Sequence, residues 1–175
     1  MKCNPHSILA VNPGTRYLGM AVFHGNQLID WRVKVLRGRW SELKLEKAIS
    51  IVDAIIDRYR PEHLAIKKLH PARSSESLND MIDRLEKLAL RNGIRLHRYS
   101  IKQIEAFLCG EKRKNKRNLA EAVAAIYPEL YLELQIEYPK PKDEKKKEKL
   151  KSPYHIRMFE AVALGVVCTN EFFNN

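Results

Sequence analysis

Three polar residues stand where the surrounding sequence predicts buried apolar structure, and their types indicate a charged pair with an amide beside it. Asn12 and Lys67 each directly follow a short apolar run, and Glu160 interrupts an apolar helical stripe near the end of the chain. A buried carboxylate without a partner is costly. We therefore predict that Lys67 pairs with Glu160 and that Asn12 bridges them; the alternative is that Glu160 reaches solvent at the edge of its helix.

The strand that carries Asn12 is predicted from the unbroken apolar run 8–11, which is typical of a central strand buried on both faces. Pro13 cannot donate a ladder hydrogen bond and Gly14 tolerates a positive φ, so the chain turns there and returns as a second strand. Residues 27–36 alternate well enough for a third strand. The chain is therefore expected to open with three sequential antiparallel strands.

The elements that carry Lys67 and Glu160 are predicted from helical spacing and capping residues. Residues 63–67 form a short strand, which joins the sheet in parallel because a helix separates it from the first three strands. The other expected elements are a helix between Ser41 and Pro61, a loop at 71–77, a helix before Gly93, a strand at 94–99, a helix through Leu108 begun by the capping box of Ser100 and Gln103, a helix at 116–126 and a last helix from 154 to about 169. This order predicts an α/β fold with a five-stranded mixed sheet flanked by helices.

Length and cysteine usage narrow the class of protein. A chain of 175 residues can bury a sizeable core, and we expect a single domain over residues 1–175. Cys3, Cys109 and Cys168 are widely spaced and form no Cys-x-x-Cys motif, which indicates a reducing compartment and no zinc site. The sequence shows neither a signal peptide nor an apolar run of membrane-spanning length, so we expect a cytoplasmic protein without a membrane partner.

The charge of the chain favours a polyanionic partner such as nucleic acid. The formal net charge is +11 and the sequence pI is about 9.6, with much of the excess in the segments 112–117 and 140–151. The alternative is a solvated lysine-rich surface without a specific partner. The lysine-rich segment 139–151 has no apolar residue before Leu150 and is expected to be a mobile basic loop.

Three segments of the sequence resemble one known family. They are Ile8–Val22, Leu64–Lys67 and Phe159–Gly165. Their order and spacing are similar to those of the RuvC-type Holliday-junction resolvases of the ribonuclease H-like superfamily, and the similarity extends over most of the chain. The resemblance implies a ribonuclease H-like fold and a homodimer that acts on branched DNA.

The chemistry of that family depends on four carboxylates that hold two divalent metals, Mg²⁺ or Mn²⁺, one activating water and the other stabilising the leaving oxygen. The resemblance implies that the corresponding positions are Asn12, Lys67, Arg157 and Glu160. Only Glu160 keeps an acid, and Lys67 and Arg157 carry permanent cations. We therefore expect a degenerate site with no intact catalytic set, no metal and no small-molecule cofactor. Because inactivating substitutions are rarely charge reversals at two ligands, natural degeneration explains the set better than mutation of an active enzyme.

The expected nucleic-acid contacts lie outside the four positions of the degenerate site. In the resembled family a glycine-rich loop followed by a lysine touches DNA, and the segment from Gly110 to Arg117 takes that place here, with Lys116 matching the lysine and the family's further glycine missing. Phosphate contacts are accordingly predicted for Arg73, Lys112, Arg113, Lys114, Lys116 and Arg117. The alternative is a solvated basic loop.

These expectations favour a pseudo-nuclease that binds branched or duplex DNA without cleaving it. Two other functions stay open. One is a residual divalent-metal-dependent endonuclease that uses Glu160 and a single metal, and stoichiometric Mg²⁺ or Mn²⁺ binding that depends on Glu160 would favour it. The other is a protein-interaction subunit that kept only the fold, which an absence of DNA and RNA binding at low salt would favour.

Overall fold

The computed structural model describes residues 6–139 and 154–173, without the side chains of Arg73 and Phe173. The elements in chain order are β1 (Ser7–Asn12), β2 (Tyr17–His24), β3 (Gln27–Val35), α1 (Glu42–Tyr59), β4 (His63–Lys68), η1 (Pro71–Arg73), α2 (Glu76–Arg91), β5 (Arg95–Ser100), α3 (Ile101–Cys109), α4 (Lys116–Ile126), η2 (Pro128–Leu130), α5 (Tyr131–Glu137) and α6 (Tyr154–Phe173). None of the described helices is long and apolar enough to cross a lipid bilayer.

The strands form one mixed sheet in the order β3-β2-β1-β4-β5. The first three strands are antiparallel neighbours, and β4 and β5 are added in parallel to β1 and to each other. The apolar run 8–11 of β1 is fully buried, as expected for a strand at the centre of a sheet covered on both faces. The predicted five-stranded mixed sheet is therefore confirmed.

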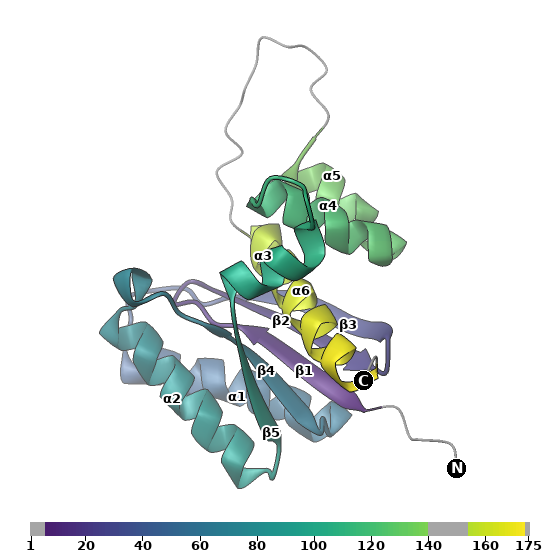
Figure 1. Cartoon of the computed structure of the whole chain (residues 1–175). Helices are drawn as coiled ribbons and strands as arrows, with labels where there is room; N and C mark the ends of the chain where they lie inside the picture. Colours follow the sequence, from purple (N-terminus) through teal and green to yellow (C-terminus); the bar gives the residue numbers. More distant parts are fainter. Residues whose placement is uncertain (1–5, 140–153, 174–175) are drawn as a thin grey trace, which may run out of the picture.

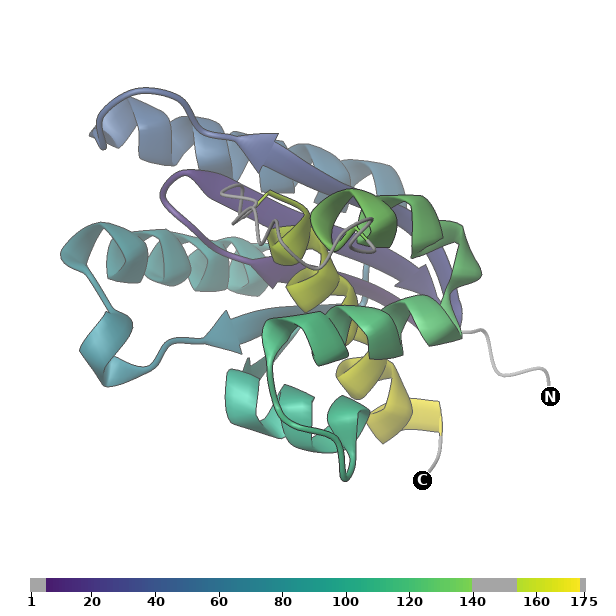
Figure 2. The same cartoon turned by 90° about the horizontal axis from the view of Figure 1, so that it is seen from above.

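Helices cover both faces of this sheet (Figures 1 and 2), with α1 and α2 on one face and α6, α3 and α4 on the other. Alternate residues of each strand enter the two cores: Leu9 and Val11 pack with α1 and α2, whereas Ile8 and Ala10 pack with α6. Asn12 has the same parity as Ala10. Its side chain therefore lies on the α6 face.

Capping residues start the helices near the positions that the sequence predicts. The Ser41 side chain accepts from Lys44 N at the start of α1, and Ser100 and Gln103 form both hydrogen bonds of the predicted capping box of α3. Asn115 caps α4 by accepting from Asn118 N at 2.8 Å. This cap places the basic residues of the neighbouring segment at the N-terminal end of α4.

The structure differs from the sequence expectations in three places. The expected loop 71–77 contains η1 and the start of α2, because the Ser75 side chain accepts from Leu78 N and caps that helix. Helix α5 was not expected, and α6 continues to Phe173, beyond the expected end. Almost all of the expected mobile loop 139–151 lies outside the described residues.

Candidate functional site

The four positions of the expected degenerate site lie together at one end of the sheet. Val11 pairs with Ile66 in the parallel β1–β4 ladder, so Asn12 and Lys67 follow at matching positions of the two strands. Helix α6 crosses this end of the sheet and supplies Arg157 and Glu160 from its first two turns (Figure 1). Two neighbouring strand ends and one helix therefore position the cluster.

The predicted ion pair is present, with Asn12 bound to the same carboxylate. Lys67 Nζ donates to Glu160 Oε2 at 2.6 Å, and Asn12 Nδ2 donates to the same oxygen at 2.8 Å. The Glu160 side chain is only 3% exposed, so the alternative in which it reaches solvent is wrong. The predicted pair is confirmed. Asn12 does not bridge the two residues as predicted, because its amide N–H donates to Glu160 and to the Arg157 carbonyl, and its Oδ1 has no partner among the described residues.

Charges around Glu160 keep it ionised in a buried position. Burial raises the pKa of the Glu160 carboxyl, but the Lys67 ammonium, through its charge and its hydrogen bond, outweighs burial and holds that pKa below its ordinary value. The charges of Lys116 and Arg157 act in the same direction. Three cations therefore surround one carboxylate, and the cluster as a whole is positive.

Arg157 connects α6 to the turn between β1 and β2. Its backbone carbonyl accepts from Asn12 Nδ2 at 3.3 Å, and its guanidinium lies next to Gly14. The same carbonyl oxygen would lie 2.2 Å from a Cβ placed on Gly19, which pairs with Asn12 across the ladder. Only a glycine at this position lets α6 approach the sheet closely enough for Glu160 to reach Asn12.

Replacing Gly19 with alanine is expected to lower the free energy of unfolding by about 1–3 kcal/mol, because the new methyl group must displace the backbone of α6. Chemical denaturation of the wild type and the variant measures the difference. Unchanged stability of the Gly19→Ala chain would contradict the close approach of α6 to β2.

The donor atoms of the cluster are already engaged with one another. Among the four positions only Glu160 offers a carboxylate, and its Oε2 accepts from both Lys67 and Asn12. The Oδ1 atom of Asn12 is buried and has no hydrogen-bond partner within the described part of the chain. The cluster can hold an anion next to its cations, whereas a single shared carboxylate is a poor ligand set for two divalent metals.

The basic segment 112–117 is displayed on the surface beside this cluster. Gly110 ends α3 with a φ of +53°, which glycine adopts without strain, and the chain then leads into α4. The side chains of Lys112, Arg113, Lys114, Lys116 and Arg117 are all exposed, and their contact with phosphate stays a prediction. Arg117 Nε also donates to Glu121 Oε1 at 3.0 Å. Arg73 ends η1 after β4, but its side chain is outside the described part of the structure.

Sequence reasoning missed a second basic feature near the β1–β2 turn. A hollow of about 540 Å³ is lined by Arg16, Arg37 and Lys44, together with Trp40 and neighbouring residues. Lys44 Nζ lies 5.8 Å from the centre of the Trp40 ring. The signal in the sequence was Arg37 and Trp40 shortly after the third strand, which alone does not show that they line one hollow with Arg16.

A family model, two relatives and a solved structure all relate this chain to RuvC proteins. The model of the family "Crossover junction endodeoxyribonuclease RuvC" matches residues 8–144. RuvC proteins from Citrifermentans bemidjiense and Geobacter sp. strain M21 are each 25% identical over 127 residues, which cover 68% of this chain and 77% of the relative. The solved structure of Thermus thermophilus RuvC with a Holliday junction substrate has a TM-score of 0.68 at 19% identity and covers 97% of this chain and 94% of that one. This likeness shows the ribonuclease H-like fold.

Proposed function

This chain belongs to the RuvC family of crossover junction endodeoxyribonucleases, and from that membership we propose that it binds branched or duplex DNA without cutting it. The observation that carries the proposal is the Lys67–Glu160 ion pair of 2.6 Å at the end of β1 and β4. It stands where the family resemblance expects carboxylates around metal.

The electrostatics of this pair oppose divalent metal binding. An ammonium about 4 Å from a divalent ion repels it by roughly 2 kcal/mol in bulk water and by roughly 8 kcal/mol at an effective dielectric constant near 20. Lys67 and Arg157 supply two permanent cations, and the remaining carboxylate is occupied. The residues present therefore do not fit a two-metal centre, and the proposal includes no hydrolytic step.

The residues of the cluster also fit one another. An aspartate in place of Asn12 has no N–H to donate to Glu160 Oε2 and would add a like charge beside it. Lys67 in turn provides the charge that a buried Glu160 requires. Such mutual compensation supports natural loss of catalysis, because an isolated inactivating substitution would not bring matching partners with it.

DNA contact is proposed for the basic segment 112–117 and for the cationic cluster beside it. Lys116 lies close enough to the cluster for its charge to lower the pKa of Glu160, so the two features adjoin. The first turn of α4 adds backbone N–H groups that favour phosphate. Affinity that rests on phosphate contacts falls steeply with salt and carries little sequence preference.

The expected homodimer belongs to the same proposal. A four-way junction offers pairs of equivalent arms, and a two-fold symmetric dimer presents the basic segment of each protomer to one arm. The two surfaces together would distinguish a junction from a linear duplex, since only the junction engages both at once.

The test is binding and cleavage measured side by side on a labelled four-way junction and a duplex of the same sequence, with chelator and with Mg²⁺ or Mn²⁺. We expect both DNAs to be bound with chelator and with metal, the junction more tightly than the duplex, and the strands to stay intact throughout. Strand cleavage that needs metal and disappears in Glu160→Gln would establish a residual nuclease instead. No binding of DNA or RNA at low salt would favour a protein-interaction subunit.

A further inference from the structure

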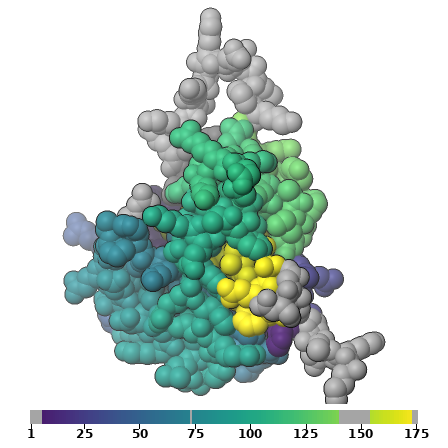
Figure 3. All heavy atoms as spheres, in the orientation of Figure 1, coloured from purple at the N-terminus to yellow at the C-terminus, as the bar shows by residue number. Residues whose placement is uncertain are grey.

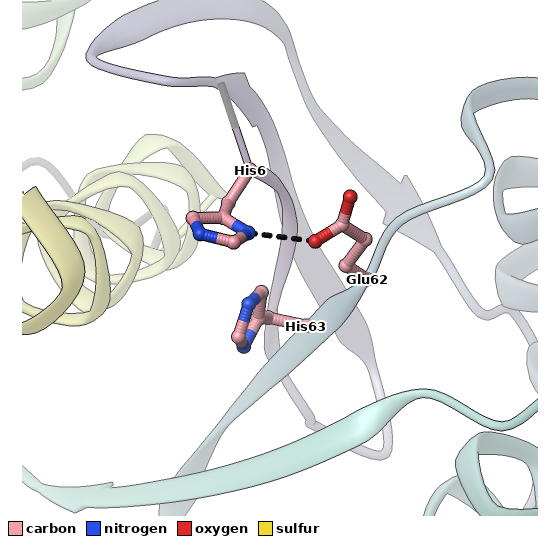
Figure 4. A group of neighbouring side chains, drawn as sticks. All are labelled: His6, Glu62 and His63. Atoms are coloured by element: carbon pink, nitrogen blue, oxygen red, sulfur yellow. Dashed lines mark hydrogen bonds and ion pairs between the residues drawn. The ribbon is translucent and has the colours of Figure 1, made fainter. Parts of the chain in front are cut away.

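A group of metal-ligand residues lies at the opposite end of the sheet from the cationic cluster. His6 directly precedes β1, Glu62 directly precedes β4, and His63 is the first residue of β4. One ligand atom from each residue lies within 4.8 Å of the others. Figure 4 shows the three side chains converging on one space beside the strands, with His6 and Glu62 directed at each other.

His63 contributes a buried nitrogen without a partner. The residue is 0% exposed, and its Nε2 has no hydrogen-bond partner within the described residues. Its other nitrogen, Nδ1, is 2.9 Å from His97 Nε2 on β5. Because β5 and β1 flank β4 on opposite sides, the bond to His97 leaves Nε2 on the side of His6. Figure 4 shows one ring nitrogen of His63 facing His6.

Aromatic rings enclose the buried His63 side chain. The Phe172 ring of α6 lies 4.2 Å from the His63 ring, centre to centre, and also packs near the rings of His6 and His97. In Figure 3 the end of α6 (yellow) reaches the surface close to the start of β1 (purple).

The other two ligands are accessible from solvent. His6 Nδ1 lies 2.6 Å from Glu62 Oε2, and their side chains are 37% and 48% exposed. Arg95 Nη2 is 3.6 Å from the same carboxylate oxygen and is 62% exposed, so it can withdraw when a cation arrives. Two imidazoles and one carboxylate form a common ligand set for zinc, which leaves a fourth position for water.

We propose that His6, Glu62 and His63 bind a divalent ion of the zinc class, and that His97 orients His63 through the hydrogen bond to its Nδ1. The bound ion ties the residue before β1 to the start of β4 and so fixes the edge where the two central strands begin. The expectation of no zinc site from the sequence rested on the cysteines alone and did not consider this ligand set.

Calorimetric titration of the full chain with Zn²⁺, and with Co²⁺ as a spectroscopic substitute, tests the site. We expect one ion per chain, a higher melting temperature with the ion, and a cobalt absorption spectrum typical of tetrahedral coordination. His6→Ala and Glu62→Gln change exposed side chains and should each weaken binding by about tenfold or more. His70→Ala removes an exposed histidine beyond the other end of β4 and should bind as the wild type does.

Three results would overturn the proposal. They are the absence of saturable binding of either ion to the wild-type chain, unchanged affinity in both His6→Ala and Glu62→Gln, and loss of binding in Glu160→Gln with retention in those two variants. The last result would place the ion at the opposite end of the sheet. None of these measurements depends on DNA, so they remain independent of the proposed function.

Discussion

Replacing Lys67 with methionine is expected to lower the free energy of unfolding by about 3 kcal/mol near neutral pH, measured by chemical denaturation. Removing one partner of a buried ion pair leaves an uncompensated charge, for which losses of about 3–5 kcal/mol are typical. Glu160 is 3% exposed and keeps only the hydrogen bond from Asn12 in this variant. The lower end of the range applies because the charges of Arg157 and Lys116 remain nearby.

The pH dependence of this loss has a definite sign. In the wild type the folded pKa of Glu160 lies below its ordinary value of 4.5, so its contribution to stability is complete above that value and is lost as the pH falls through the folded pKa. In Lys67→Met, burial instead raises the pKa of Glu160, and protonation in acid relieves the uncompensated charge. Because Glu160 titrates alike in the two unfolded chains, the stability difference between wild type and variant should shrink as the pH falls from the raised folded pKa of the variant to the lowered folded pKa of the wild type.

A double variant separates the ion pair from general damage to the core. Lys67→Met combined with Glu160→Gln removes both charges and leaves an amide that still accepts from Asn12, so it should recover much of the lost stability. Glu160→Gln alone should have a smaller effect than Lys67→Met, because the Lys67 side chain is 18% exposed and can turn its ammonium toward water. Equal losses in all three variants would contradict a stabilising pair.

Several elements were predictable because their causes are local. The apolar run 8–11 and the turn residues after it predict β1 and its antiparallel neighbour, and the reciprocal hydrogen bonds of Ser100 and Gln103 act within a single helical turn. The Lys67–Glu160 pair was predictable for a different reason. Its residues lie 93 positions apart, but a carboxylate in an apolar stripe requires a partner wherever the fold can supply one.

What the sequence did not reveal depends on the packing of distant strands or on a weak pattern. Helix α5 has only seven residues and none of them is buried, so its apolar pattern is weak. The group of His6, Glu62 and His63 forms only because β1 and β4 are parallel neighbours in which Ile8 pairs with His63, a register that no local motif encodes. The same register brings Asn12 and Lys67 together at the other end of the sheet. Each of these residues ends an apolar run of similar length, so the sequence alone indicates that they lie side by side.

Replacing the five cations of the basic segment with alanine is expected to weaken junction binding by about a hundredfold or more at moderate salt. The five are Lys112, Arg113, Lys114, Lys116 and Arg117, and all are exposed. Each phosphate contact adds about 0.9 to the slope of log affinity against log salt, so the slope should flatten by up to about 4.5. Fluorescence anisotropy over a salt series measures both quantities. Alanine suits a helix, and Asn115 still caps α4, so the variant should fold.

A charge-matched control decides whether position or total charge matters. Arg58, Arg84, Lys87, Arg91 and Arg98 are exposed cations of α1, α2 and β5. Either set of five substitutions lowers the formal net charge from +11 to +6. If the segment beside the Lys67–Glu160 pair holds the phosphates, the control set should change affinity only slightly. Equal losses in both variants would indicate attraction by net charge alone, and an unchanged affinity in the first variant would refute the proposed DNA surface.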